Sequence, residues 1–547
     1  MRTKANPIGR TVHSFEMYPS TPISRSKFDR SHSLLTSLNS GYLVPIYHDE
    51  ALPGDTLIMS CRGFARLATQ IVPFMDNVYM DVHFWSVPNR LLWEHWEAMN
   101  GDQPNPGDST DYLTPQISVT NVEVGSIYDY FGIPTGLPNA LSFNAFNFRA
   151  YNLVYNEWYR DENLIERVPH IVSDTDSYEN YTLLKRGKRK DYFTGALPSP
   201  QKGPGVELPL GSVAPVVPVD SSSTDINVLT GSSPTNVNMY FPQNQLSAFR
   251  YGSIATKSTS DTTLVSTAGG LQTVNPTNKT NLKVEPLQVD LSDASAATIN
   301  SLRQAFAIQR MFEKDARGGT RYTEMILSHF GVKSPDARMQ RPEFLGGATF
   351  NLNLSVVPQT SSTNGTTPQA NLSSFGTIQG ESGRIVHSFT EHCTVIGLVS
   401  IRADYTYQQG LERSYSRRQR IDYYLPTLAN LGEQAVLNKE IYAQGTDSDD
   451  EVFGYQERWS EYRYKQNFIT GQLRSQAPQS LDIWHLAQDF ASLPQLNEEF
   501  INENPPISRV IAVTGDNTPE FIANFYFDEK WVRPMPVYSI PSLSSHF

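Results

Sequence analysis

Apolar and polar residues alternate most regularly in segment 77–87. Its apolar side chains recur at every second position, namely Val78, Met80, Val82 and Phe84. Because successive side chains of an extended chain point to opposite faces, this period predicts a strand with one buried face. Looser patterns predict further strands at 42–47, 56–69, 348–357, 385–405, 510–513 and 521–527. The run CTVIGLVSI inside 385–405 is almost continuously apolar, which is typical of a strand buried on both faces.

A different period predicts helices between these strands. Apolar and aromatic residues in 146–160 recur three or four positions apart, at Phe148, Tyr151, Tyr155, Trp158 and Tyr159. Segment 293–330 has the same period, interrupted at ARGGTRY, and shorter helices are expected at 90–99 and 481–490. These patterns predict a mainly β, antiparallel fold whose connections contain helices and long excursions.

Segment 454–474 does not follow either period clearly. Read as a helix, it places Trp459, Tyr462 and Arg463 on one face, whereas read as an extended chain it separates the tyrosines from the charges. Aromatic residues and arginine are enriched at protein interfaces, and arginine also suits bidentate contacts to carboxylates and phosphates. Composition alone leaves open whether this segment is a polar-edged part of the core or a contact surface.

Changes of composition divide the chain into five parts. A basic, proline-interrupted arm at 1–30 precedes the first part of the folded core at 31–210. Residues 211–285 are rich in Ser and Thr and poor in charge, so they are either a linker or an inserted β-rich excursion. So long a linker would be unusual, and we therefore expect an ordered surface insertion, which Tyr240, Phe241, Phe249 and Tyr251 would help to pack. The second part of the core at 286–530 leads to an extended, proline-rich tail at 531–547.

The composition indicates the cellular compartment in which the chain folds and restricts the partners that it can bind. Two cysteines are too few for a disulfide framework, and neither a secretory signal nor an apolar run of membrane-spanning length is present. We therefore expect a chain that folds in the cytoplasm without membrane insertion. The net charge of −12 argues against a protein coated in positive charge, so contact with a polyanion would rely on local basic clusters.

The motifs of common enzyme classes are missing from the sequence. It contains no phosphate-binding G-x-x-x-x-G-K-[ST], no H-E-x-x-H, no G-x-S-x-G and no C-x-x-C. His83 and His95 lack a third ligand at a recognisable spacing, and the acidic run at 447–451 lacks the glycine and the final glutamate of a calcium loop. We expect no cofactor, no metal and no enzymatic activity.

Long blocks of the sequence resemble one family. They are SKFDRSHSLLTSLNSGYLVPIYHDEALPGDT at 26–56, HFWSVPNRLLWEHWEAMNG at 83–101, FNFRAYNLVYNEWYRDENL at 146–164, DYFTGALPSPQKG at 191–203, RMFEKDARGGTRYTEMILSHFGVKSPDARMQRPEFLGG at 310–347 and GYQERWSEYRYKQNFITG at 454–471. In this order they resemble the major capsid proteins of the microviruses (Microviridae), small icosahedral single-stranded DNA bacteriophages. Within this family the blocks are most similar to the gokushovirus branch.

The resemblance implies an eight-stranded antiparallel jelly roll with long, partly helical insertions between strands. It also implies a structural protein of the virion, assembled in the bacterial host cytoplasm as sixty copies in a T=1 shell around circular single-stranded DNA. The insertion would protrude at the threefold axes and serve host attachment through a surface receptor. The negative net charge and the resemblance together predict a small, basic, DNA-associated partner protein.

Three sets of residues are the candidates for these contacts. The DNA-contacting candidates are Arg2, Lys4, Arg10, Arg417, Arg418 and Arg420, with the cluster 185–190 as a weaker choice because it could pair with acidic neighbours. The subunit-interface candidates are Trp459, Tyr462, Arg463, Trp484, Trp531 and Tyr538, and the host-facing candidates are Tyr240, Phe241, Phe249 and Tyr251. The alternative function is a carbohydrate-binding or sugar-active β-sandwich enzyme, which the Trp and Tyr content would also fit.

Overall fold

A computed structural model describes residues 24–206, 299–319, 321–332, 340–365, 367–513 and 518–538, together with six short strands between 216 and 289. The chain forms two compact units. The first combines residues 1–202 and 313–547, and the second comprises residues 203–312. The two units are described separately.

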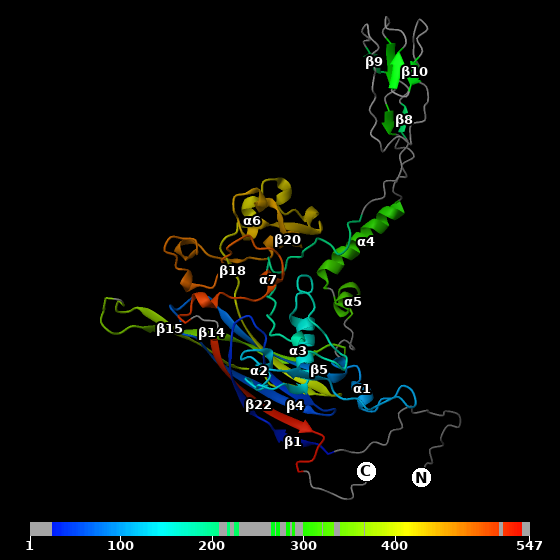
Figure 1. Cartoon of the computed structure of the whole chain (residues 1–547). Coiled ribbons are helices and arrows are strands. Elements are labelled where there is room, and N and C mark those ends of the chain that lie inside the picture. Colours follow the sequence, from blue (N-terminus) through cyan, green and yellow to red (C-terminus); the bar gives the residue numbers. More distant parts are fainter. Residues whose placement is uncertain are drawn as a thin grey trace, which may run out of the picture. The chain divides into compact units, whose positions relative to one another are not determined.

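One large antiparallel sheet organises the first unit (Figure 1). Its strands are β1 (Ser26–Asp29), β2 (His32–Leu38), β3 (Val44–Ala51), β4 (Thr56–Leu67), β5 (Val78–Pro88), β14 (Glu343–Pro358), β15 (Leu372–Glu381), β16 (Ile385–Ser388), β17 (Cys393–Ala403) and β22 (Phe521–Arg533). The order across the sheet is β1-β22-β4-β15-β14-β5-β17-β3; β2 also pairs with β22, and β16 also pairs with β4.

The ten strands therefore occupy eight positions in two halves. One half is β1/β2-β22-β4-β15/β16 and the other is β14-β5-β17-β3, and the chain passes repeatedly between them. This connectivity in a curled antiparallel sheet is that of a jelly roll, which confirms the fold expected from the resemblance.

Curling brings the two edges of the sheet together. The Tyr47 ring of edge strand β3 lies 5.2 Å from the Phe527 ring of β22 and stacks against His32 of β2 at 5.9 Å. Alternate side chains of β22 point into the interior of the curled sheet. Phe521, Ala523, Phe525 and Phe527 are buried, while the residues between them are exposed. Burial of these rings and of the facing side chains of β4 and β5 forms the main hydrophobic core.

Helices cover the half of the sheet that contains β3, β5 and β17 (Figure 1). They are α2 (Ile127–Tyr130) and α3 (Phe146–Val154), the latter continuing as a π-helical turn to Tyr159. Trp85 and Leu398 of the sheet join Phe148 and Tyr151 of α3 in a second core. The same unit contains α1 (Trp96–Met99), α5 (Tyr322–Phe330), and the pair β6 (Gln116–Val119) and β7 (Leu141–Asn144).

The connection from β17 to β22 forms a third, smaller core together with Ile165, Tyr192 and Phe193. It contains β18 (Thr406–Tyr407), β19 (Glu433–Leu437), α6 (Asn438–Ile441), β20 (Val452–Glu457), β21 (Asn467–Phe468) and α7 (Glu498–Ile501). Strands β19 and β20 pair antiparallel, and β18 and β21 pair parallel. Between them run short 3-10 turns, which hold many of the predicted contact residues.

The second unit contains nested antiparallel pairs. Strand β8 (Val216–Pro218) pairs with β13 (Leu287–Val289), β9 (Thr224–Val228) with β12 (Thr280–Val284), and β10 (Leu264–Thr267) with β11 (Gly270–Thr273). Helix α4 (Ile299–Arg317) begins in this unit and ends in the first. These pairs lie in and just beyond the segment expected as an insertion at 211–285.

The structure confirms the strongest sequence patterns and corrects weaker ones. Strands β4, β5, β14 and β22 and the interrupted helix α4–α5 occur where predicted. The predicted helix at 481–490 is wrong beyond a turn at Asp482–Trp484, because the backbone that follows pairs elsewhere: the Gln488 N–H donates to the Thr406 carbonyl at 2.9 Å. The predicted strand at 510–513 is reduced to one bridge between Ile511 and Gln70.

Two boundaries also differ from the sequence pattern. Strand β22 continues through residues 531–533, which pair with β1, so the sheet includes the first residues of the expected tail. Strand β1 likewise lies inside the expected N-terminal arm. Segment 454–474 is neither one helix nor one strand, since it leaves β20 through a 3-10 turn at Ser460–Tyr462 before reaching β21.

Candidate functional site

The 3-10 turn after β20 is fixed by a buried tryptophan. Trp459 has a left-handed backbone (φ 71°), and its side chain is buried. Its indole N–H donates to the Leu428 carbonyl at 2.9 Å. A non-glycine residue in this conformation costs free energy, which the burial and this hydrogen bond offset. Trp459 therefore anchors the turn to its own subunit and offers no surface to a neighbour.

Two glutamates, Glu461 in this turn and Glu440 in α6, bind the surrounding arginines. Glu440 is buried, which raises the pKa of its carboxyl group, and it accepts hydrogen bonds from Arg413 at 2.7 Å and from the Tyr192 hydroxyl at 2.8 Å. Glu461 accepts from Arg417 at 3.1 Å and from Gln434 at 2.7 Å. Each carboxylate thus joins chain segments that are distant in sequence.

The Arg417 guanidinium lies beneath an exposed group of aromatic rings. Its central carbon is 4.4 Å from the Tyr462 ring centroid and 5.7 Å from that of Tyr423. The Tyr424 ring lies 6.3 Å from Tyr462, and the Ile421 carbonyl accepts a hydrogen bond from Arg458. We call this group the tyrosine surface; its exposed side chains are Ile421, Tyr423, Tyr424 and Tyr462.

The tyrosine surface is suited to protein–protein contact. About half of each of these four side chains is exposed, although apolar and aromatic area usually gains free energy by burial. The ion pair with Glu461 and the Tyr462 ring hold Arg417 in place, so little side-chain entropy would be lost on binding. Tyrosine and arginine are frequent hot-spot residues in interfaces.

The predicted arginines of this region differ in their environments. Arg417 is largely buried and ion-paired, and Arg463 is paired with Glu457. Arg418 and Arg420 are exposed, and within the described residues neither has an ion pair. Of the three predicted DNA contacts here, Arg418 and Arg420 are therefore the two that present free positive charge.

The remaining predicted interface residues are scattered. Trp531 is fully buried between sheet strands, where its ring stacks on Phe389 at 5.8 Å, so it contributes to the core of its own subunit. Trp484 is half-buried and Tyr538 is exposed. The predicted residues that lie outside the described part of the chain are Arg2, Lys4, Arg10, Tyr240, Phe241, Phe249 and Tyr251.

Most basic residues of the cluster 185–190 pair with acidic side chains, which is the alternative to DNA contact that the sequence analysis gave for this cluster. Asp81 is fully buried and accepts from Arg186 at 2.6 Å, Arg402 at 3.0 Å and Arg189 at 3.1 Å. Although burial alone would raise its pKa, these cations and the Thr349 hydroxyl hold the pKa of Asp81 well below its usual range. The cluster therefore has a structural role in the jelly roll, where it binds the buried carboxylate of Asp81.

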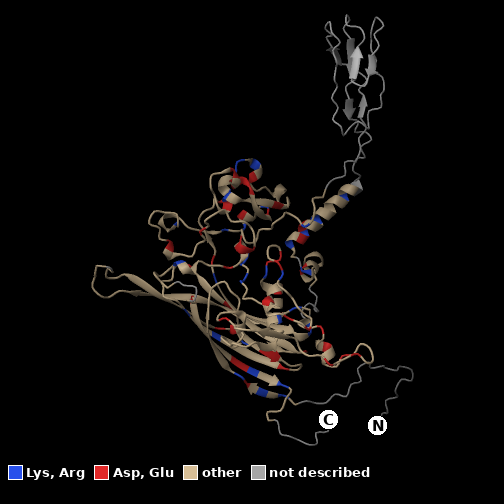
Figure 2. Ribbon diagram, viewed as in Figure 1, with Lys and Arg blue, Asp and Glu red and all other residues tan. Residues whose placement is uncertain are grey.

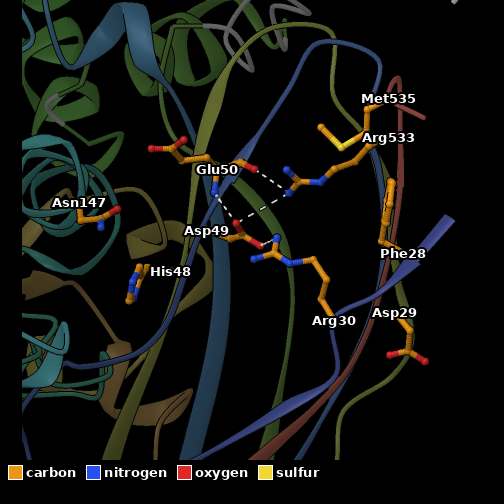
Figure 3. Close-up of a pocket in the computed structure, with 9 residues that line it drawn as sticks. All are labelled: Phe28, Asp29, Arg30, His48, Asp49, Glu50, Asn147, Arg533 and Met535. Atoms are coloured by element: carbon orange, nitrogen blue, oxygen red, sulfur yellow. Dashed lines mark hydrogen bonds and ion pairs between the residues drawn. The ribbon is translucent and has the colours of Figure 1, made fainter. Parts of the chain in front are cut away.

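A pocket of about 610 Å³ lies where the two edges of the curled sheet meet (Figure 3). Arg30 and Arg533 enter it, but both pair with Asp49, and Arg533 also donates to the Glu50 carbonyl at 2.9 Å. Asp29 adds a further carboxylate to the lining. Because the carboxylates balance the cations, these contacts close the sheet and leave no positive site for a phosphate.

The histidines behave as structural residues. His83 Nδ1 lies 2.8 Å from the Tyr159 hydroxyl, and burial lowers the pKa of His83 to about 4. His95 pairs with Asp174 at 2.9 Å. Among the described residues no cluster of three or more His, Cys, Asp or Glu side chains could hold a metal. None of the described helices has the length and apolar character needed to cross a membrane.

Comparison with known proteins identifies the family. Residues 16–543 match the family described as "Capsid protein (F protein)". The chain belongs to this family of microvirus capsid proteins. A protein named "Capsid protein VP1" from Bdellovibrio phage phiMH2K is 46% identical over 543 residues, which cover 98% of each chain. Proteins of the same name from Chlamydia phage 1 and Spiroplasma virus 4 are 43% and 36% identical, with at least 97% of each chain covered.

These relatives are gokushovirus proteins, so the branch expected from the sequence blocks is confirmed. This capsid protein is a structural component of the virion and not an enzyme, which removes the carbohydrate-active alternative. Sequence reasoning missed Tyr423 and Tyr424 as partners of Tyr462. The available signal was the pair of adjacent tyrosines in RIDYYLP, directly after the arginine cluster that the sequence analysis did select.

Proposed function

We propose that this capsid protein assembles as sixty copies into a T=1 icosahedral shell around circular single-stranded DNA. The observation that carries the proposal is the end-to-end match to proteins named capsid protein VP1. The tyrosine surface supports it with an exposed, preorganised patch of interface-type residues within the shared sequence blocks. A shell needs several such contacts on each subunit.

The genome is contacted mainly through its phosphates, without sequence selection. Arg418 and Arg420 are the described residues of the predicted set that are free for this role, and the N-terminal arm would add Arg2, Lys4 and Arg10. The net charge of −12 leaves most phosphates to other cations, so a small basic virion protein accompanies the DNA. The insertion at 211–285 provides the host-attachment surface at the threefold axes.

Imaging and mass measurement test the assembly proposal. The full-length chain is produced in bacteria, and particles are examined by electron microscopy and native mass spectrometry. We expect closed particles with icosahedral symmetry and the mass of sixty chains. A small oligomer as the largest species, with the basic partner supplied, would overturn the proposal.

Host attachment is tested separately on assembled particles. Deleting 211–285 and joining the ends through a short Gly/Ser linker should leave particle formation intact and abolish adsorption to host cells. Normal adsorption of these particles would make the insertion a passive spacer.

A further inference from the structure

In the described part of the chain, the helices that pack on the sheet cover the half with β3, β5 and β17; the other half has an exposed outer face that the expected contacts do not include. We call it the bare sheet face; its exposed side chains are Leu35, Arg62, Phe64, Arg66, Ile522 and Tyr526. They come from β2, β4 and β22, and alternation along each strand directs them away from the buried core side chains. Figure 2 shows both basic and acidic residues on these strands and on neighbouring β1.

Strand register determines how this face is arranged. Tyr526 lies opposite Arg62, Asn524 opposite Phe64, and Ile522 opposite Arg66. The two rings are therefore diagonal neighbours on adjacent strands, for which the spacing is about 7–8 Å. Arg62 and Arg66 stand two residues before and after Phe64 on the same face of β4. Phe64 thus lies between two arginines on the sheet surface, and Tyr526 lies beside one of them, Arg62.

The charges on this face are available to a ligand. Arg66 is exposed, and no acidic side chain of the described residues pairs with it. Arg62 pairs with Glu381 at 3.2 Å, but both side chains are at least half exposed, and such pairs contribute little free energy. Exchanging this glutamate for a phosphate would therefore cost little. Asp528, further along the same face of β22, pairs with Lys530 at 3.5 Å, so the face keeps an excess of positive charge in a chain whose net charge is −12.

We propose that the bare sheet face binds single-stranded DNA without sequence preference. Phe64 and Tyr526 stack on bases, and Arg62 and Arg66 bind the flanking phosphates. Sheet-borne aromatics that stack successive bases, with arginines on the backbone, are the chemistry by which proteins hold unpaired strands. This inference rests on the proposed function, because that function places a single-stranded genome inside the shell.

The face is less suited to another copy of the chain. Its apolar side chains are separated by polar ones, since Asn524 and Gln379 lie on either side of Phe64 across the strands. Cores of protein interfaces are instead depleted in charge, whereas the two arginines here flank the ring directly. Charge complementarity and the diagonal pair of rings together favour a polyanion with stacking bases.

Fluorescence anisotropy on the full-length, unassembled subunit tests the proposal. The probe is a fluorescein-labelled thirty-nucleotide oligothymidine, with a duplex of the same length for comparison. We expect the double substitution Phe64→Ser, Tyr526→Ser to weaken single-strand binding at least about tenfold and duplex binding much less. Arg62→Gln, Arg66→Gln should weaken binding of both probes and reduce the slope of log Kd against log salt by about 1.4 for the single strand.

Two further variants provide controls. Arg62→Lys, Arg66→Lys keeps the charge and should retain most of the affinity and the salt slope. Arg418→Gln, Arg420→Gln removes two arginines of the proposed genome contacts elsewhere on the subunit and should weaken single-strand and duplex binding by a similar factor. Circular dichroism verifies that every variant is folded. Unchanged affinity in both bare-face double variants would overturn the inference.

Particle assays separate this inference from the proposed function. Bare-face variants that still form shells but package less DNA support both the DNA-binding inference and the assembly proposal. Bare-face variants that bind the oligonucleotide normally and lose only shell formation would make the face a contact between copies, which overturns the inference and leaves the assembly proposal standing. If the wild-type chain binds the oligonucleotide but never forms shells, and the bare-face variants lose that binding, the inference stands and the assembly proposal fails.

Discussion

The guanidinium of Arg149 and the carboxylate of Asp176 form an ion pair, with 2.8 Å between Nε and Oδ2, in which neither side chain reaches solvent. The ion pair links α3, which contains Arg149, to the covering loop that contains Asp176. Arg149 also donates to the carbonyls of Leu92 and Ser173, and Tyr181 donates to Asp176 at 2.7 Å. Every charged atom of the pair is thereby matched, as burial of charge requires.

Replacing one partner of this pair should destabilise the subunit strongly. Asp176→Asn leaves the buried guanidinium without a counter-charge, and we expect the free energy of unfolding to fall by about 3 to 5 kcal/mol. Urea denaturation of the unassembled subunit measures the change. The control is Glu412→Gln, which breaks an exposed pair with Lys465 and should cost less than about 1 kcal/mol. Equal effects of the two substitutions would contradict the assigned role.

Burial of His83 makes stability depend on pH. The folded state lowers the pKa of His83 to about 4, whereas an unfolded histidine has a pKa near 6.5. Below pH 6.5 the unfolded chain therefore binds a proton that the folded chain does not, and the folded state loses stability. We expect this residue alone to remove up to about 3 kcal/mol as the pH falls through about 4.

The variant His83→Gln isolates this contribution. Its urea midpoint should decline less than that of the wild type between pH 6.5 and pH 4, although its stability at pH 7 is lower because the contact with Tyr159 changes. Parallel decline of the two proteins over this range would show that His83 does not carry the pH dependence.

Local sequence patterns predicted the strands because burial of one face repeats every second residue. This signal located β5 and β4 almost to their ends. The curl of the sheet and its buried polar contacts depend on residues far apart, such as Asp81 with Arg186 and Arg402, which are separated by 105 and 321 positions. No short window of sequence contains that information.

The candidate contact residues were harder to predict, because aromatic residues are common both in protein cores and in interfaces. Trp459 and Tyr462 are only three residues apart, yet the first is buried and the second is exposed. For Trp531 a signal existed: it continues the alternation of Phe525 and Phe527 along β22. The prolines at 534 and 536 suggested a tail from residue 531, whereas the strand ends only at Arg533.

The end of β22 gives a prediction for truncated chains. A chain that ends at Lys530 lacks Trp531, which is fully buried, and Arg533, whose Nε lies 3.4 Å from buried Asp55. Loss of a buried tryptophan alone costs about 3 to 5 kcal/mol, so this chain should be severely destabilised or insoluble. A chain that ends at Pro534 keeps the strand and should match the full-length subunit in thermal unfolding. If the two truncations unfold at the same temperature, β22 does not depend on its last residues.

The tyrosine surface gives the most direct prediction for assembly. Tyr423 and Tyr462 expose 51% and 52% of their side chains, so replacing both by serine should change the folding of the subunit little. A tyrosine that acts as an interface hot spot contributes about 2 kcal/mol or more, and a shell repeats each contact in every subunit. We therefore expect the double variant to sediment as folded subunits, with particle yield reduced at least about tenfold.

The matched control is Tyr178→Ser, because Tyr178 is about equally exposed (48%) but lies outside the tyrosine surface. This variant should assemble as the wild type does, in the same sedimentation velocity experiment. Particles formed in normal yield by the double variant would show that assembly does not bury the tyrosine surface. Reduced yield from both variants would instead indicate a general effect of removing exposed aromatic side chains, and the surface would lose its specific role.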